Sequence, residues 1–452
     1  MDFDLTDEQA QLRDAVRALG RRYGHGYFVA KAKAGEHTTE LWSEAGRLGY
    51  LGVNIPTGYG GGGGGITELA IVCEELAAAG CPLLLLVVSP AIAGTVIARH
   101  GTEEQRSRFL PGLADGSTKV AFAITEPEAG SNFHQLGTVA RRDGDDWLIS
   151  GRKCYISGVD EADHVLVVAR VPADPDGTVS PGAGGATASG SPDDGGATAG
   201  GSPDDGGATA GGSPDDGGAT AGGKGGKGAT AGGKGATAGG SPRLRPALFV
   251  VPTDAPGLTR SRLEMEIVSP ENQFLLYLDE VRVPADALVG GSVDAGLPAL
   301  FAGLNPERIT VAAMGVGTGR YALERASEYT ATRRVWRGRS IGSHQGVAHP
   351  LAHAAVQVEL ARLMIYKAAT RYDAGRDLEA GIAGNLAKYA AGEAAALAVD
   401  TAVQALGGAG MTTEYGVATL LGAVRAGRIA PVSREMILNF VAQHVLGQEK
   451  SY

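Results

Sequence analysis

The chain has 452 residues, of which 43% are apolar, so it can bury a sizeable core as one multi-lobed unit or several domains. Lys+Arg 40 against Asp+Glu 50 gives a net charge of −10, which argues against a nucleic-acid binder and a basic membrane-surface protein. The three cysteines form no CxxC pair and the nine histidines no HExxH motif, so we expect neither disulfides nor a metal site. The opening MDFDLTDEQ lacks the apolar segment of a secretory signal, and the longest aliphatic run, residues 83–88, is too short to span a bilayer. We therefore expect a cytoplasmic protein without a membrane segment.

The first region, residues 1–117, is predicted to be helical. Thr6 and Gln9 have the spacing of a capping box and precede apolar residues at helical intervals. Another helix is predicted over residues 67–79, and the glycines at 60–65 predict a loop before it.

The second region, residues 118–288, contains short apolar runs rich in β-branched residues, which are typical of strands. The predicted strands cover residues 120–124, 147–150, 153–157, 164–170, 247–252 and 274–278. From residue 289 to 452 an alanine-rich helical pattern returns, with predicted helices over 308–329, 346–374 and 380–406.

One segment of the β region has an unusual composition. Residues 177–240 hold 25 of the 71 glycines and an eleven-residue repeat, GSPDDGGATAG. Such a sequence cannot bury enough apolar surface to offset the entropy of ordering its backbone. We expect a disordered insertion over residues 177–242, placed in the loop of a hairpin rather than at a domain boundary.

Two short motifs of the β region have residues suited to a ligand. Residues 122–132, FAITEPEAGSN, run from a strand into a Pro/Gly-rich turn, which can direct N–H groups and hydroxyls toward carbonyl or phosphate oxygens. Residues 153–157, KCYIS, place Tyr155 and Ser157 on one strand face, where they could lie against a flat heteroaromatic ring. An ordinary strand-end loop and core packing are the alternatives.

In this order, and about 30 residues apart, the two motifs resemble the TEPxAGS loop and the W/Y-I-S/T strand of the acyl-CoA dehydrogenase family. The resemblance extends over nearly the whole chain except the insertion. It implies an α+β multidomain fold with an N-terminal all-α domain, a central β-barrel-like domain and a C-terminal four-helix bundle. It also implies FAD as cofactor and a homotetramer or homodimer.

The resemblance gives residues of both motifs a role in binding the flavin. These residues are Phe122, Ile124, Thr125, Gly130, Ser131, Tyr155 and Ser157. Ser131 would also lie near the thioester of the substrate. A hydroxyl or N–H group at the reactive edge of a flavin stabilises the charge that the ring gains on reduction.

Two further elements resemble the family's contacts to the rest of FAD. Residues 334–345, RVWRGRSIGSHQ, are similar to RxxFGxxIxxxxQ, so Arg334 and Gln345 would contact the diphosphate and adenosine side, although Arg337 replaces the usual Phe. Residues 404–410, QALGGAG, match QxxGGxG; there Gln404, Gly407 and Gly408 would approach the FAD of a neighbouring subunit. A basic surface turn and a helix-ending glycine cluster are the alternatives.

The family's reaction needs a carboxylate base, and many members carry it in a C-terminal YEGTS element. The corresponding residues here are 429–436, IAPVSREM, in which Pro431 takes the place of the glutamate. Ser433 and Glu435 would then lie on the flavin side. Proline has no N–H group to polarise the thioester carbonyl, so either Val432 supplies that donor or the site is weaker.

A subset of the family places its glutamate just before an arginine on an earlier helix, and this chain reads Leu-Asn-Pro-Glu-Arg at 304–308. Glu307 is therefore the candidate base, with Asn305 and Arg308 near the pantetheine or thioester. Pro306 is expected at the start of a helix. Glu307 could instead be a first-turn acid favoured by the helix dipole, and Glu435 is the second candidate base.

The resemblance predicts an FAD-dependent acyl-CoA dehydrogenase of fatty acid or lipid metabolism. It would abstract an α-proton from a substrate carried by CoA or by an acyl carrier protein, form an α,β-unsaturated thioester and pass its electrons to an electron-transfer flavoprotein. Two alternatives stay open: a flavin monooxygenase or oxidase of the same fold that acts on a non-thioester substrate, and a non-catalytic flavin-binding paralogue.

Overall fold

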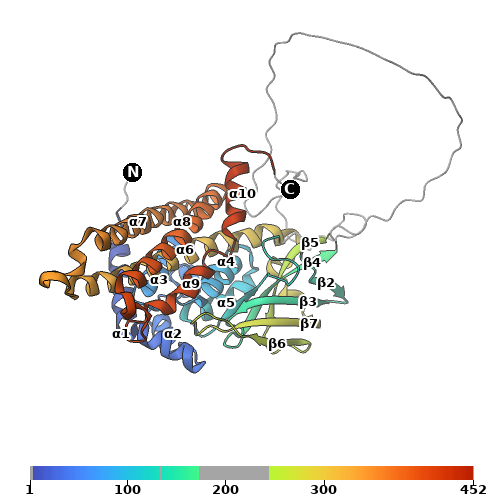
Figure 1. Ribbon diagram of the computed structural model, residues 1–452. Helices are drawn as coiled ribbons and strands as arrows, with labels where there is room; N and C mark the ends of the chain where they lie inside the picture. The colour runs from blue at the N-terminus through green and yellow to red at the C-terminus, as the bar shows by residue number, and fades with distance from the viewer. Residues whose placement is uncertain (1–3, 133–134, 173–243, 451–452) are drawn as a thin grey trace, which may run out of the picture.

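The computed structural model describes residues 4–132, 135–172 and 244–450 (Figure 1). The chain starts with a helical region, whose α-helices are α1 (Asp7–Ala34), α2 (Thr39–Arg47), α3 (Ile66–Ala78), α4 (Thr95–His100) and α5 (Glu103–Asp115). The predicted capping box is confirmed, because the Thr6 hydroxyl accepts from the Gln9 N–H and the Gln9 side chain from the Thr6 N–H. The predicted disorder of residues 177–242 lies outside the described residues.

A curled seven-stranded sheet follows the first helices. Its strands are β1 (Val120–Ala123), β2 (Val139–Asp143), β3 (Asp146–Ser157), β4 (His164–Pro172), β5 (Leu244–Pro252), β6 (Leu258–Leu263) and β7 (Gln273–Val283). The order is β1-β4-β2-β3-β7-β6, with β5 paired to β4. Strands β4 and β5, which flank the insertion, pair antiparallel along their whole lengths. The insertion therefore connects two hairpin partners, as predicted.

Both faces of the sheet are covered where β1, β4 and β5 meet. Phe122 and Leu166 join a large hydrophobic cluster with the surrounding helices, whereas Ala121 and Val165 join a second cluster inside the curl of the sheet. Because neither face meets water, these strands are continuous apolar runs rather than alternating ones.

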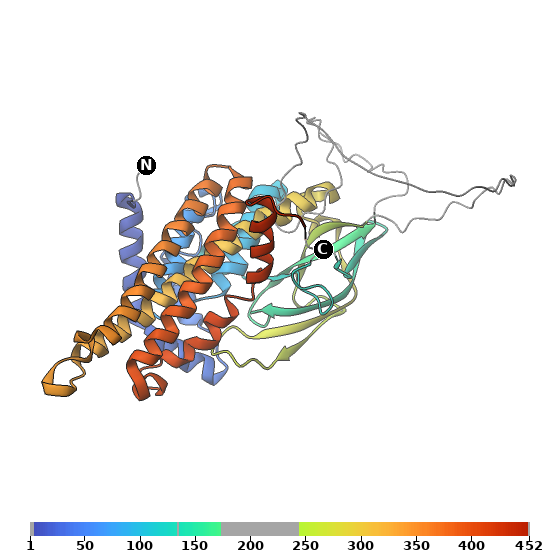
Figure 2. The same cartoon turned by 45° about the horizontal axis from the view of Figure 1, so that its top comes forward.

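The C-terminal region is a helical bundle. Its α-helices are α6 (Gly296–Thr332), α7 (Gln345–Asp373), α8 (Asp377–Leu406), α9 (Leu421–Ala426) and α10 (Arg434–His444). The long helices α6, α7 and α8 lie side by side in both views (Figures 1 and 2). One segment of the described residues, Asp377–Met411, is apolar and long enough to span a membrane. Buried alanines of α8 pack in the cores of the bundle, which accounts for its apolar character.

The start of α6 corrects one prediction. Pro306 does not begin a helix, since α6 begins at Gly296 and Pro306 lies within it. A proline inside a helix has no N–H for the carbonyl four residues earlier, here that of Ala302. The hydroxyl of Tyr372 on α7 donates to this carbonyl at 2.8 Å. A contact between helices therefore satisfies the group that the local sequence leaves unpaired.

A buried ion pair joins the two predicted flavin-binding motifs. Lys153 on β3 is fully buried, and its Nζ donates to Oε1 of Glu126 at 2.8 Å and to the carbonyl of Ile124 at 3.0 Å. Glu126 also accepts hydrogen bonds from the N–H groups of Gly137 and Thr138 and from the Thr138 hydroxyl. The loop after β1 is therefore held against β3 by charges and hydrogen bonds together.

The pKa of Glu126 depends strongly on the charge of Lys153. Burial alone would raise the pKa of Glu126, but the charge of Lys153 and the hydrogen bonds from Thr138 and Gly137 bring that pKa below its ordinary value. Glu126 is therefore held as a carboxylate. If one partner is removed, the other is left as a buried and uncompensated charge.

Substitution of Lys153 tests this pair. Lys153→Met should lower the free energy of unfolding by about 3–5 kcal/mol, because the Glu126 carboxylate would lose its buried partner. Arg152→Met is the matched control, since it breaks only an exposed pair with Glu128 at 3.5 Å and should cost less than about 1 kcal/mol. Urea denaturation at neutral pH measures both changes. Equal losses in the two variants would contradict the account.

Candidate active site

The loop after β1 and the end of β3 lie side by side. The N–H of Cys154 donates to the carbonyl of Thr125 at 2.9 Å, which places Thr125 next to Tyr155. Tyr155 has a φ of 58° beside an irregularity in the β3–β7 pairing. A left-handed conformation is costly for a bulky residue and is often found at functional sites.

The side chains at this junction differ in exposure in a way that suits a flat ligand. Tyr155 is 62% exposed, Ile156 is buried, and Thr125 and Ser157 are half-buried. Gly130 and Ser131 are exposed on the loop. Phe122 is buried in the hydrophobic cluster, and Ile124 is half-buried and packs against it. Ser157 Oγ contacts the Gln273 amide at the start of β7, at 2.9 Å from Nε2 and 3.1 Å from Oε1.

Glu307 lies on α6, more than two turns after the start of the helix, so it is not a first-turn acid. Its side chain is half-buried, and within the described residues its carboxylate makes no hydrogen bond or ion pair. Burial raises the pKa of Glu307 to about 7, against the opposing charges of Arg308 and Lys388. A carboxylate with this pKa is suited to accept a proton near neutral pH.

Arg308 and Asn305 lie beside Glu307 on α6 and are both buried. Arg308 Nη1 donates to Asn305 Oδ1 at 2.9 Å, and Asn305 Nδ2 donates to the carbonyl of Asp377 at 3.4 Å. Among the described residues, Nε and Nη2 of Arg308 have no hydrogen-bond partner. Because unpaired buried donors are costly, this guanidinium is suited to a ligand that brings acceptor oxygens.

Charged groups of α8 and α10 complete this region. Lys388 is buried on α8 and donates to the carbonyl of Val432, directly after Pro431. Burial lowers the pKa of Lys388 to about 8, although the charge of Glu307 opposes the change. Ser433 caps α10 by accepting from the N–H of Met436 at 3.3 Å. The Glu435 side chain is 74% exposed, so it lacks the dry surroundings that suit a base.

The predicted contacts to the rest of FAD lie elsewhere in the chain. Arg334 and Gln345 are exposed at the turn between α6 and α7, at the end of the bundle away from the sheet (Figure 2). Gln404, Gly407 and Gly408 are exposed at the end of α8, where Leu406 shares a hydrophobic cluster with the distal parts of α6 and α7. One chain therefore does not bring these residues to Thr125 and Tyr155.

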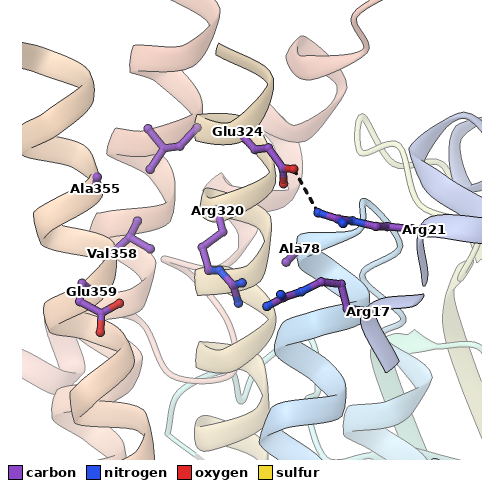
Figure 3. Close-up of a pocket in the computed structure, with 9 residues that line it drawn as sticks. Arg17, Arg21, Ala78, Arg320, Glu324, Ala355, Val358 and Glu359 are labelled. Atoms are coloured by element: carbon purple, nitrogen blue, oxygen red, sulfur yellow. Dashed lines mark hydrogen bonds and ion pairs between the residues drawn. The ribbon is translucent and has the colours of Figure 1, made fainter. Parts of the chain in front are cut away.

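Two surface cavities are not lined by Thr125, Tyr155 or Glu307, although the second includes Ser340, Gly342 and Ser343 of the element at 334–345. One, of about 360 Å³, contains Arg17, Arg21 and Arg320 (Figure 3), and the other, of about 500 Å³, lies beside the α6–α7 turn. The arginines of the first are paired: Arg21 with Glu324, and both Arg17 and Arg320 with the buried Glu75. None of the predicted site residues lines either cavity. We therefore do not place the substrate in them.

Sequence reasoning missed three functional candidates: Lys153, Gln273 and Lys388. Lys153 stands in the KCYIS motif, and a lysine inside an otherwise buried strand is a signal that could have indicated an ion pair. Lys388 is likewise the one basic residue of the alanine-rich helix α8. Gln273 carries no comparable signal, because only the β3–β7 pairing brings it to Ser157.

Comparison with known proteins agrees with the fold. Three acyl-CoA dehydrogenase domain families match the chain: the N-terminal domain at residues 6–117, the middle domain at 121–188 and the C-terminal domain at 294–446. Acyl-CoA dehydrogenase FadE12 of Mycobacterium tuberculosis is 52% identical over 450 residues, which cover 100% of this chain and 99% of the relative. Glutaryl-CoA dehydrogenase of Desulfococcus multivorans is 30% identical over 429 residues, 92% of this chain and 91% of that protein.

Solved structures give the same result. A glutaryl-CoA dehydrogenase in complex with glutaryl-CoA has a TM-score of 0.79 at 27% identity, and covers 100% of this chain and 98% of that chain. A glutaryl-CoA dehydrogenase from Mycobacterium smegmatis in complex with FADH2 has a TM-score of 0.76 at 23% identity, and the match covers 99% of this chain and 96% of that chain. The predicted helical, sheet and helical architecture is confirmed. The chain belongs to the acyl-CoA dehydrogenase family of oxidoreductases, which act on CH–CH groups of acyl-CoA.

Proposed function

We propose that this chain is an FAD-dependent dehydrogenase of acyl thioesters in which Glu307 removes the α-proton of the substrate. The observation that carries the proposal is the state of Glu307: a half-buried carboxylate, with its pKa raised to about 7 and no hydrogen-bond partner within the described residues. A base held in this way is free to accept a proton from carbon.

The residues beside β3 fit an isoalloxazine ring. The side-chain hydroxyls of Thr125 and Ser131 make no hydrogen bond within the part of the chain that the structure describes. The exposed Tyr155 ring supplies a flat surface next to them. When bound, FAD supplies the acceptor for the hydride equivalent that leaves the β-carbon, which leaves an α,β-unsaturated thioester.

Residues of the chain then have distinct roles around the thioester. Glu307 accepts the α-proton, and Arg308 offers its two unpaired donors to acceptor oxygens of the thioester or the pantetheine. Lys388 holds the carbonyl of Val432 and so fixes the peptide that follows Pro431. In this proposal the N–H of Val432 polarises the thioester carbonyl, which makes the α-proton more acidic.

We also propose that two copies of the chain complete each FAD site. Arg334, Gln345 and Gln404 lie at the distal end of the bundle, so a second copy is needed to bring them to the flavin bound beside Tyr155. An exposed apolar stripe on α7 is suited to such a contact, with Val356 and Leu360 each 55% exposed and Leu363 40% exposed. We propose an electron-transfer flavoprotein as the acceptor of the electrons.

An anaerobic titration tests the function. The purified protein should be yellow, and a panel of acyl-CoAs should include one that bleaches the flavin absorbance. Reoxidation should require an electron-transfer flavoprotein and not dioxygen alone. A colourless protein that takes up no FAD, or a flavin that no acyl-CoA bleaches, would contradict the proposal. Rapid oxygen consumption without a thioester would favour an oxidase instead.

Glu307→Gln should lower the rate of flavin reduction by acyl-CoA at least about 100-fold, because the amide cannot accept the α-proton. FAD content should remain close to one per chain. Glu104→Gln is the control, because Glu104 is exposed on α5 and has no role in the proposed site, and its rate should stay near that of the wild type. A Glu307→Gln enzyme that keeps its rate would reassign the base.

The pH profile gives a second test of the base. The kcat/KM of the wild type should fall as the pH drops below about 7, since the protonated Glu307 cannot act as a base. The positive charge of Lys388 opposes the rise in the pKa of Glu307. Lys388→Met should therefore move this acidic limb to higher pH. An unchanged limb in an enzyme that still binds FAD would show that Lys388 does not act on the base.

The assembly can be tested at α7. Leu360→Glu should give a smaller species in light scattering and also lower the FAD content, because the second copy would no longer supply its distal contacts. Leu378→Glu makes the same change at an exposed leucine in the first turn of α8 and should leave both quantities unchanged. Loss of assembly with full retention of FAD would show that the site is complete within one chain.

A further inference from the structure

Two residues directly before β7, Glu271 and Asn272, anchor the chain where Gln273 meets the end of β3. Glu271 is buried and accepts from the N–H of Leu84 and from the Ser269 hydroxyl, both at 2.8 Å. Asn272 Nδ2 donates to Asp160 Oδ2 at 2.7 Å, and the Asn272 carbonyl accepts from the N–H of Gly158 at 2.9 Å. These contacts hold the residues that directly precede Gln273, and the Asn272–Gly158 bond joins them to the residue that follows Ser157.

Gln273 and Ser157 are direct partners in the β3–β7 pairing, so the sheet sets the distance between their side chains. The shorter of the two contacts, 2.9 Å, joins Gln273 Nε2 to Ser157 Oγ, and the longer, 3.1 Å, joins Oγ to Oε1. A serine hydroxyl has one proton to donate and two lone pairs that accept. If the amide N–H donates to Oγ, the hydroxyl proton is free to be donated to another group.

We propose that Gln273 is a positioning residue, whose amide N–H occupies a lone pair of Ser157 and directs the hydroxyl proton of Ser157 toward the bound flavin. The inference rests on the proposed function, because it needs FAD beside β3. A donor at the edge of the flavin that gains negative charge stabilises the reduced ring more than the oxidised ring. Gln273 therefore raises the reduction potential of the flavin through Ser157.

Two substitutions of Gln273 distinguish the loss of its N–H donor from the loss of both polar atoms of its side chain. Gln273→Glu keeps the length of the side chain but offers only acceptor oxygens when ionised, so the Ser157 hydroxyl would donate to it and not to the flavin. Gln273→Leu removes both polar atoms. Gln11→Glu, at an exposed position of α1 on the side of the helices away from the sheet (Figure 2), adds the same charge away from the site and serves as the matched control.

The midpoint potential of the bound flavin is the decisive measurement, with FAD content per chain measured in the same samples. At a fixed solution potential, Gln273→Glu should lower the ratio of reduced to oxidised flavin about tenfold, which corresponds to about 30 mV for a two-electron couple. Gln273→Leu should also lower this ratio, but by a smaller factor. Gln11→Glu should leave the potential unchanged, and all variants should keep their FAD.

The route through Ser157 needs a double-mutant cycle. Ser157→Ala should lower the potential, and adding Gln273→Leu to it should cause no further change. An equal effect of Gln273→Leu with and without Ser157 would overturn the inference, as would unchanged potentials in variants that bind FAD. A wild-type protein that binds no FAD would instead overturn the proposed function, so the two failures can be told apart.

Discussion

The ion pair between Lys153 and Glu126 holds together the two segments on which the proposed site depends. A lysine without exposed surface and a glutamate with little are stable in a core only as partners that also satisfy their other hydrogen bonds. Here the carbonyl of Ile124 and the N–H groups of Gly137 and Thr138 do so. Because the neighbouring residues are Thr125 and Cys154, the pair places one polar loop beside the strand that carries Tyr155 and Ser157.

A second set of charges lies between α6, α8 and the segment before α10. Glu307, Arg308 and Lys388 act on one another electrostatically, and burial shifts the pKa of each toward the neutral form. Such a group of coupled ions is unfavourable for stability alone and is typical of sites where protons move. Under the proposal that Glu307 on α6 is the base, the reaction needs no glutamate at the position of Pro431.

Much of the architecture follows from the sequence because its signals are local. The capping box at Thr6, the strands that flank the insertion and the alanine-rich helices are confirmed. Pro306 was misplaced because the group that tolerates it, the Tyr372 hydroxyl, comes from another helix. Gln273 is missed for a similar reason, since its partner is distant in sequence. The roles given to the individual flavin and substrate residues remain predictions.

The most direct test of the account is a crystal structure of the protein with FAD and a non-oxidisable thioether analogue of acyl-CoA. The account predicts that the tricyclic ring lies between Thr125 and Ser157, and that a carboxylate oxygen of Glu307 contacts the α-carbon of the analogue on the side away from the ring. A structure in which another carboxylate occupies that position, or in which the ring lies away from β3, would contradict it.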